Sequence, residues 1–292
     1  MANAAFGMAD DFPLPMNPPF SAHAAAALTA GGPTDFAAIL RHHGLSPQVP
    51  DAGNSQSAAR NPHAPTPTQA TTILAFKFAD GVLVAGDRRA TAGNTIMYDR
   101  ADKVLEIDRH SLMAIAGVPA TAWEMARVLE HSFHFFRRTQ LAEMSLEGKV
   151  RALSKLLRDN LGFVLQGVGV VVPIFATFDA AAKIPRVYFY DPMGAQFEAA
   201  DFAATGSGSP AVRAVLHYEN SYARKPLRKL KGSEAVLLAL RALDTAAESD
   251  SATGGVDRHA RVFPIVKLIT ARGIETLPDA KLAKLYKANL SA

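Results

Sequence analysis

The character of this 292-residue sequence changes abruptly at Thr71, and that change limits where a folded domain can begin. Ten of the 18 prolines fall within the first 70 residues, together with runs rich in Ser, Asn and Thr. Such a composition cannot bury enough apolar surface to offset the entropy lost on ordering, so residues 1–70 are predicted to form a largely disordered leader. Only residues 34–43 show helical periodicity there. From Thr71 onward β-branched and apolar residues dominate, and the folded domain is predicted to span residues 71–292.

The composition excludes several classes of site. The chain has no cysteine, which excludes disulfides, thiolate metal sites and cysteine nucleophiles. No apolar run is long enough to span a bilayer, and Asp10 and Asp11 occupy the place where a secretory signal has basic residues, so a cytoplasmic protein is expected. His131 and His134 lie three apart among phenylalanines, where packing or a subunit contact is a better interpretation than metal binding. We expect no metal and no cofactor.

A basic excess after residue 70 raises the alternative of nucleic-acid binding. Residues 71–292 carry 29 basic and 23 acidic side chains. Much of this excess comes from residues 224–231, a stretch that contains Pro226, lies between helical patterns and has no interleaved aromatic residue. A solvated interhelical loop accounts for it better than a nucleic-acid surface, and no nucleic-acid or membrane partner is expected.

The pattern after Thr71 predicts strands, two helices, strands, helices and strands. Residues 71–78 and 82–85 form a predicted hairpin around Asp80-Gly81, with Ile73 and Ala75 on one face and Leu74, Phe76 and Phe78 on the other. A sheet that is apolar on both faces needs cover on each side. The other predicted strands are 103–107, 111–116, 168–178, 186–191, 197–203, 262–270 and 273–276. The predicted helices are 120–139, 145–165 with Ser145 as its cap, a short one after Pro210, 233–247 and one from Pro278. The buried stripe expected for the first of them consists of Trp123, Ala126, Val128, Leu129 and Phe133. This order favours two stacked sheets between helical layers.

Six short motifs give the sequence a more specific resemblance. They are Thr71-Thr72-Ile73, Gly86-Asp87-Arg88-Arg89-Ala90-Thr91, Lys103, Ala114-Ile115-Ala116-Gly117, Gly206-Ser207-Gly208-Ser209 and Asp250-Ser251-Ala252-Thr253-Gly254-Gly255. In order and spacing this series resembles the β subunits of proteasomes, which are N-terminal-nucleophile threonine peptidases. The resemblance covers residues 71 to about 280. It implies an α+β fold, namely the four-layer αββα sandwich of two mainly antiparallel sheets found in Ntn hydrolases.

The chemistry explains why these residue types occur together. A threonine hydroxyl is a poor nucleophile near neutral pH, and an N-terminal threonine supplies a base in its own α-amine. The resemblance makes Thr71 that residue, with Lys103 lowering the pKa of the amine by like-charge repulsion and Asp87 holding Lys103 in place. It further implies that Ser207, Asp250 and Thr253 surround the amine. The backbone N–H of Gly117 would then serve as the oxyanion-hole donor.

The same chemistry gives the leader a role. While Ala70 is attached, the Thr71 nitrogen is a non-basic amide, so the precursor lacks its base. The resemblance implies self-cleavage between Ala70 and Thr71, although the family usually has glycine before the threonine.

The hairpin sets one geometric condition on this site. With an unbroken ladder Thr71 would face Ala90 and Asp87 would point to the opposite face, so regular pairing must end or bulge near Gly86.

The resemblance also implies a substrate pocket and partners, and two alternative assignments share part of it. Ala90, Thr91, Ala101, Ile115 and Pro119 would help to form the pocket for the residue before the scissile bond, which suggests an apolar preference. Expected partners are proteasome α subunits and other β subunits in stacked heptameric rings, an unfolding ATPase ring and unfolded protein substrates.

The motif wording and long leader are closer to actinobacterial-type proteasomes than to the HslV peptidase, which normally has almost no leader. A catalytically silent ring subunit would usually have lost Thr71 or Lys103, and both are present.

Overall fold

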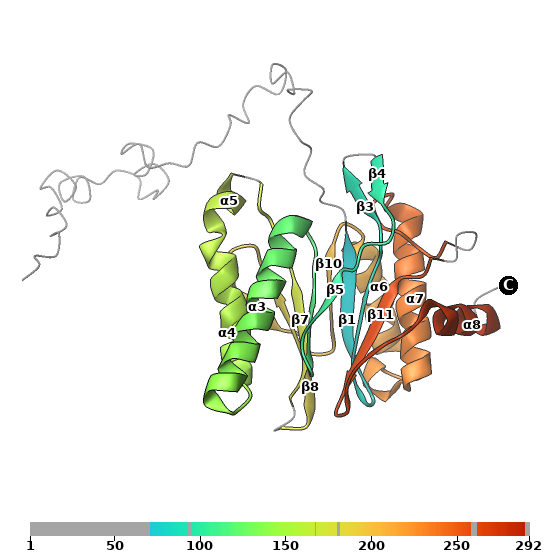
Figure 1. Cartoon of the computed structure of the whole chain (residues 1–292). Coiled ribbons are helices and arrows are strands. Elements are labelled where there is room, and N and C mark those ends of the chain that lie inside the picture. Colours follow the sequence, from blue (N-terminus) through green and yellow to red (C-terminus); the bar gives the residue numbers. More distant parts are fainter. Residues whose placement is uncertain (1–70, 93–94, 167, 180–181, 258–261, 290–292) are drawn as a thin grey trace, which may run out of the picture. The chain divides into compact units, whose positions relative to one another are not determined.

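The structure is a computed structural model that describes residues 71–92, 95–166, 168–179, 182–257 and 262–289. The predicted leader, its segment 34–43 and Ala70 lie outside these residues. The described residues form two five-stranded antiparallel sheets and a two-stranded ribbon (Figure 1). The ribbon consists of β3 (Ala90–Ala92) and β4 (Thr95–Tyr98), which the sequence pattern did not indicate.

The first sheet has the strand order β10-β1-β2-β11-β12. Its strands are β1 (Thr72–Phe78), β2 (Gly81–Gly86), β10 (Phe202–Gly206), β11 (Ile265–Thr270) and β12 (Gly273–Thr276). Alternate residues of β1 enter two different cores: Ile73 and Ala75 face the second sheet, whereas Leu74, Phe76 and Phe78 face helices. The predicted division of β1 into two apolar faces is therefore confirmed.

The second sheet has the strand order β5-β6-β7-β8-β9. Its strands are β5 (Val104–Asp108), β6 (Ser111–Ala114), β7 (Ile174–Asp179), β8 (Ile184–Tyr190) and β9 (Gln196–Glu198). The helices that follow β6 in sequence are α3 (Pro119–Gln140), α4 (Leu146–Asp159) and α5 (Leu161–Leu165). Ser145 caps α4 as predicted, because its hydroxyl accepts the Gly148 N–H at 3.1 Å.

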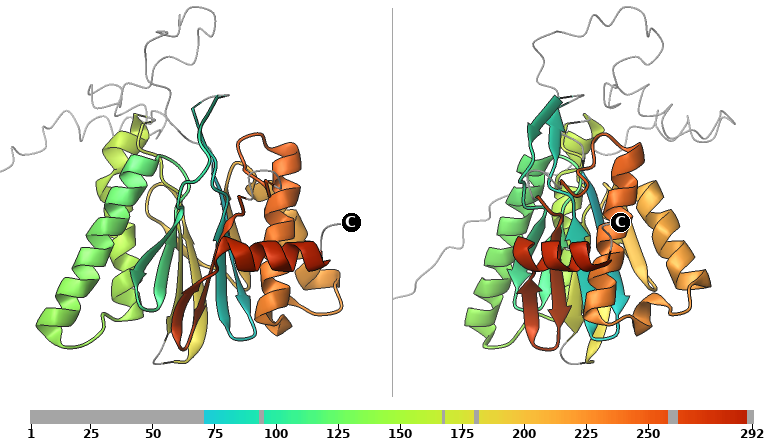
Figure 2. Two further views of the ribbon diagram at one scale, coloured as in Figure 1. Left: turned by 45° about the vertical axis from the view of Figure 1, so that its right-hand side comes forward. Right: turned by 90° about the vertical axis from the view of Figure 1, so that its right-hand side faces the viewer.

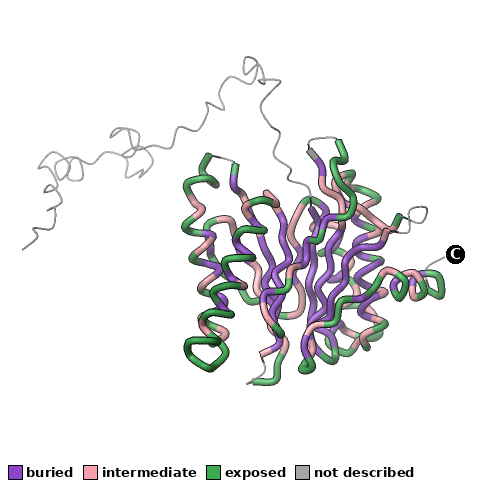
Figure 3. The backbone as a smooth tube through the Cα atoms, in the orientation of Figure 1, coloured by how far each residue is buried: buried purple, intermediate pink, exposed green. Residues whose placement is uncertain are grey.

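The two sheets share a buried core, and each packs helices on its other face (Figure 2). Helices α6 (Ser209–Tyr222), α7 (Gly232–Ser249) and α8 (Asp279–Asn289) pack on the first sheet, with the short helix η1 (Leu227–Lys229) between α6 and α7. Helices α3 and α4 pack on the second sheet. The central strands are accordingly the most continuously buried segments (Figure 3). The predicted α+β class with antiparallel sheets is confirmed, and no described helix has the length and apolarity needed to cross a bilayer.

The hairpin between β1 and β2 turns one residue earlier than predicted. Phe78 pairs with Gly81, so Ala79 and Asp80 form the turn and Gly81 already belongs to β2. Glycine is required at residue 81 for a different reason, because a Cβ there would lie 1.9 Å from the Ile269 carbonyl oxygen of the neighbouring strand. Close approach of β11, rather than the turn, requires glycine at this position.

Several predicted strands extend beyond the strands that form; for example, β6 ends at Ala114 rather than 116, and β11 begins at Ile265 rather than 262. In segment 168–178 the regular strand begins only at Ile174, because Pro173 has no N–H to donate, and Val171 forms an isolated bridge. Segment 197–203 is not one strand, since β9 ends at Glu198 in the second sheet and β10 begins at Phe202 in the first. The apolar pattern runs across this crossing because Ala199 and Ala203 both face the shared core.

The predicted helices also need two corrections. The helix predicted over 145–165 is interrupted at Asn160, which separates α4 from α5. In α3, Ala126, Leu129 and Phe133 are buried as expected, but Trp123 and Val128 are exposed. Trp123, which the helical pattern predicted to be a core residue, is 42% exposed and lines a pocket described below.

Replacing a buried leucine of α7 tests how strongly the helical layer stabilises the first sheet. Leu243 is fully buried against β1 and β2, so Leu243→Ala is expected to lower the free energy of unfolding by about 2–5 kcal/mol. Leu165, which is 52% exposed, provides a matched control whose change to alanine should cost about 0.5 kcal/mol or less. Urea titration of the full chain followed by circular dichroism measures both. Equal losses for the two variants would contradict this packing.

Candidate functional site

Thr71 lies immediately before β1 and is held by the residue that follows β10, the strand beside β1. Its side chain is largely buried, with the residue 4% exposed, and its carbonyl oxygen accepts the Ser207 N–H at 3.0 Å. This contact depends on Gly206, whose φ is +99° and whose Cβ, if present, would lie 1.8 Å from the Thr71 oxygen. Any side chain at residue 206 would therefore displace Thr71.

Regular pairing between β1 and β2 ends at Gly86, which meets the geometric condition set by the sequence. The last ladder pair is Ile73 with Gly86, and the Asp87 N–H then donates to the Thr72 carbonyl at 3.0 Å. Because the strand stops there, the Asp87 side chain can turn toward the start of β1. It is fully buried and accepts the Thr72 N–H, rather than lying on the opposite face.

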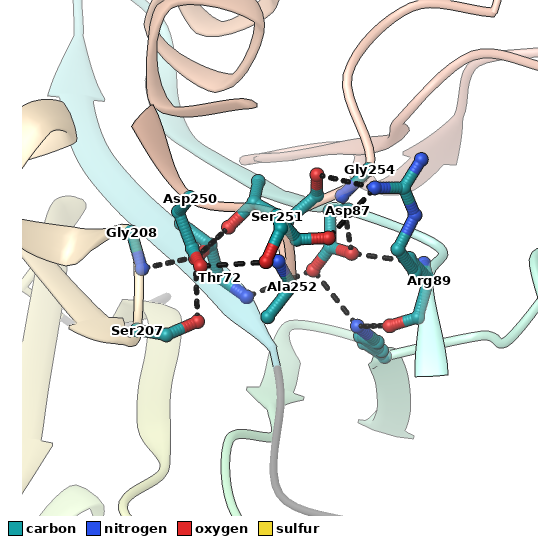
Figure 4. A network of polar contacts seen from close by, with 11 residues as sticks. Thr72, Asp87, Arg89, Ser207, Gly208, Asp250, Ser251, Ala252 and Gly254 are labelled. Carbon is teal, nitrogen blue, oxygen red and sulfur yellow. Dashed lines mark hydrogen bonds and ion pairs between the residues drawn. The ribbon is translucent and has the colours of Figure 1, made fainter. Parts of the chain in front are cut away.

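The Asp87 carboxylate is the centre of a hydrogen-bond network (Figure 4). Its Oδ1 accepts the Thr72 N–H at 2.8 Å and the Lys103 ammonium at 2.8 Å. Its Oδ2 accepts the backbone N–H groups of Arg89 at 2.8 Å and Gly254 at 3.0 Å. Four donors compensate the loss of water around a buried carboxylate.

Lys103 is the buried cation of the site. It precedes β5, is 4% exposed, and donates to the Arg89 carbonyl as well as to Asp87. A Cβ on Gly86 would lie 3.1 Å from the side chain of Ile73 and 3.6 Å from the Cβ of Lys103, so the lysine packs over Gly86 at the end of β2. Burial lowers the pKa of Lys103, and the attraction of Asp87 opposes part of that change.

A second set of polar groups surrounds Asp250, the residue that follows the end of α7. Its Oδ2 accepts the hydroxyls of Ser207 at 2.6 Å and Thr253 at 2.5 Å. Burial alone would raise the pKa of Asp250, but these two hydrogen bonds hold it below its ordinary value. The Thr253 hydroxyl also lies 2.5 Å from that of Thr72, which accepts the Gly208 N–H at 2.9 Å.

Thr72 is thus part of the site, although sequence reasoning gave it no role. A β-branched residue at the start of a strand is what strand propensity alone predicts. The available signal was polarity: Thr72 carries a hydroxyl in a strand that is otherwise buried on both faces. A buried hydroxyl needs a partner, which a purely apolar strand cannot provide.

A pocket of about 360 Å³ opens in front of Thr71 and Lys103. Four of the predicted pocket residues line it, namely Ala90, Ala101, Ile115 and Pro119. Thr91 does not line it and is buried within β3. The other lining residues are Met97, Tyr98, Gly117, Val118, Ala120 and Trp123. The walls are therefore mainly apolar, with Lys103 as the charged group.

Gly117 is among the residues that line this pocket, and the bridge it forms does not use its backbone N–H. Its bridge with Val171 is made by two hydrogen bonds, from Val118 N–H to the Val170 carbonyl at 2.9 Å and from Val172 N–H to the Ala116 carbonyl at 2.8 Å. Neither bond involves the Gly117 N–H. Gly117 has φ +111°, and a Cβ there would lie 2.1 Å from the Val170 oxygen, so only glycine fits.

A larger pocket of about 860 Å³ lies between α7, α8 and β11 and contains none of the predicted site residues. Among the described residues no cluster of three or more His, Asp or Glu side chains is arranged to hold a metal. The site is accordingly defined by Thr71, the ion pair of Asp87 with Lys103, and the hydroxyl groups around Asp250. This set brings hydroxyl groups, a buried cation and backbone N–H donors into one region.

Comparison with known proteins gives a consistent result. The family model described as "Proteasome subunit" matches residues 68–261. The chain is 41% identical over 223 residues to proteasome subunit beta 2 of Thermomonospora curvata, an alignment covering 76% of this chain and 77% of that protein. It is 37% identical over 251 residues to proteasome subunit beta of Acidimicrobium ferrooxidans, covering 86% and 87%. It is 38% identical over 235 residues to the corresponding subunit of Streptomyces griseus, covering 80% and 79%.

The balance of forces on Lys103 can be tested by removing its counter-ion. Asp87→Asn deletes the charge that opposes the effect of burial, so the pKa of Lys103 is expected to fall further below its ordinary value. The charged form is then lost at lower pH than in the unmodified chain. NMR titration of ¹³C-labelled lysine measures this. Asp108→Asn, which removes from β5 a carboxylate that pairs with Lys149 of α4 at 2.7 Å, should leave the Lys103 signal unchanged. An unchanged or raised pKa in Asp87→Asn would contradict the assignment.

Proposed function

This chain belongs to the proteasome subunit family as a β-type threonine peptidase subunit, and we propose that Thr71 is its nucleophile. The observation that carries the proposal is the buried ion pair of Asp87 and Lys103 beside Thr71, at a pocket that Gly117 also lines. Once residue 71 is the N-terminus, its α-amine has an ordinary pKa of roughly 7.7 to 8.0. The ammonium of Lys103 lowers that pKa, so the amine is available as a base near neutral pH.

Peptide cleavage then proceeds in two halves. The Thr71 hydroxyl attacks the substrate carbonyl carbon and passes its proton to its own amine, and the resulting oxyanion accepts the Gly117 N–H. Collapse breaks the C–N bond as the amine gives the proton to the leaving nitrogen, which leaves an ester on Thr71. A water molecule attacks this ester and loses a proton to the amine. The ester C–O bond then breaks, the protonated amine returns its proton to the Thr71 oxygen, and the carboxylic acid product leaves.

Asp87, Ser207, Asp250 and Thr253 position these groups. Asp87 keeps Lys103 charged and aimed at the start of β1. Ser207 and Thr253 are both bound to the carboxylate of Asp250, and their oxygen atoms provide the polar surroundings of the amine. In the precursor the Thr71 nitrogen is an amide and has no base function, so residues 1–70 act as an inhibitory leader that is removed by cleavage between Ala70 and Thr71.

The wider setting follows from the family. Proteasome β subunits assemble with α subunits and with other β subunits in rings. We infer that this chain forms heptameric rings stacked between α rings in the cytoplasm, and that an unfolding ATPase delivers unfolded proteins to them. The two sheets with outer helices would then be the αββα sandwich of Ntn hydrolases. Ala90, Ala101, Ile115 and Pro119, which line the pocket, would shape the preference for an apolar residue before the scissile bond.

Replacing the nucleophile tests the proposal directly. Thr71→Ala is expected to abolish both leader removal and peptide hydrolysis in the chain assembled with its α-type partners, because no hydroxyl remains to attack. Thr71→Ser keeps a hydroxyl and should retain measurable activity, whereas Thr95→Ala on β4 should behave as wild type. Intact mass before and after assembly, together with turnover of a fluorogenic peptide, gives the result. A mature chain beginning elsewhere, or full turnover by Thr71→Ala, would refute the proposal.

Narrowing the pocket should change the choice of substrate. Ala101 is nearly buried in the wall of the pocket, and Ala101→Leu leaves less room for a large side chain. The kcat/KM for peptides with Leu or Phe before the scissile bond is expected to fall about tenfold relative to peptides with Ala there. Ala142→Leu adds the same side chain at an exposed position outside the pocket and should leave the ratio unchanged. An unchanged ratio in Ala101→Leu would place the specificity pocket elsewhere.

A further inference from the structure

Thr72 connects the two halves of the site through two different groups. Its backbone N–H donates to Asp87, which binds Lys103. Its hydroxyl contacts Thr253, which binds Asp250. The residue is fully buried, so water cannot replace either contact. A single residue adjacent to Thr71 therefore links the ion pair to the hydroxyl cluster (Figure 4).

The direction of the hydrogen bonds through Thr72 can be worked out from the number of available protons. Asp250, whose pKa is lowered, is an ionised acceptor, so the bond from Thr253 to Asp250 uses the one proton of the Thr253 hydroxyl. In the 2.5 Å contact between the two threonines, Thr72 must consequently be the donor. Its oxygen in turn accepts from the Gly208 N–H. The hydrogen bonds thus run in one direction, from Gly208 through Thr72 and Thr253 to Asp250.

This order has a consequence for the orientation of the neighbouring hydroxyls. As long as Thr72 donates to Thr253, the Thr253 hydroxyl is held in the rotamer that donates to Asp250. The Asp250 carboxylate is then held in the orientation that accepts the Ser207 hydroxyl as well. Hydrogen bonds in a buried chain polarise one another, so losing one member affects the rest. Gly208 is equally constrained, because a Cβ there would lie 2.7 Å from the hydroxyl oxygens of both Thr72 and Thr253.

We propose that Thr72 is a positioning residue of the peptidase site, whose hydroxyl fixes Thr253 and Asp250 around the amine of the mature Thr71. The proposal rests on the proposed function, since it assigns Thr72 a role in that same reaction. Thr72 contacts the groups that orient the base rather than the substrate. Its loss should therefore affect the chemical step more than substrate binding.

Two substitutions separate the hydroxyl from the shape of the side chain. Thr72→Val keeps the shape and removes the hydroxyl, whereas Thr72→Ser keeps the hydroxyl. In the assembled, processed enzyme, Thr72→Val is expected to lower kcat about tenfold with little change in KM, in line with the loss of one buried hydrogen bond. The pH profile of kcat/KM should also shift, because the surroundings of the amine change. Thr72→Ser should restore both values.

A matched control shows whether any buried threonine has the same effect. Thr177 is buried in β7 and its hydroxyl donates to the His110 carbonyl at 2.8 Å, far in the sequence from the site residues. Thr177→Val should leave kcat and the pH profile unchanged. If it produces the same change as Thr72→Val, general loss of packing or stability explains the effect and the proposal is overturned.

A double-mutant cycle gives a readout that does not depend on the absolute activity of one variant. If Thr72 acts through Thr253, Thr72→Val should reduce kcat much less in a Thr253→Val background than in the wild type. Equal effects in both backgrounds, or a Thr72→Ser variant as impaired as Thr72→Val, would overturn the inference. Should Thr72→Val fail to assemble, Thr72→Ala provides a second hydroxyl-free chain for the same cycle. Absence of peptidase activity in the wild type would instead reject the proposed function.

Discussion

The architecture of this site depends on burying one ion pair at the end of a strand. Charges transferred from water into a protein lose solvation energy, which a single partner rarely restores. Asp87 has four donors, and Lys103 has both Asp87 and the Arg89 carbonyl. The backbone groups that satisfy Asp87 come from three separate segments, so the ion pair forms only when β1, the segment after β2 and the loop after α7 have all reached their final positions.

Glycines provide the space in which these segments meet. Gly206 lets β10 approach the carbonyl of Thr71, and Gly117 turns the chain between β6 and α3 while its N–H stays out of the bridge with Val171. Both have positive φ, a conformation that other residues adopt with strain. In the sequence these positions appear only as members of short motifs. Their physical function becomes clear from the atoms that an added Cβ would meet.

Much of this arrangement was accessible from the sequence, and the failures have physical causes. Alternation of Ile73 and Ala75 with Leu74 and Phe76 predicted a strand covered on both faces, because period and burial are both local properties. The strand crossing between Glu198 and Phe202 was missed, since an apolar pattern does not record which sheet its residues join. The ribbon of β3 and β4 was missed because it is short and no residue of its second strand is buried. The role of Thr72 depends on a contact with Thr253, 181 residues away, and no local pattern contains it.

The ladder of β1 begins at Thr72, and the residue before it is anchored through its carbonyl group. In the described chain, every pairing that holds this strand involves Thr72 or a later residue. A chain cut just before Thr71 would therefore retain β1 intact, and its new first residue would be as immobile as the sheet behind it. The conformational entropy that a flexible terminus loses when it is oriented toward a substrate would already have been lost when the sheet folded.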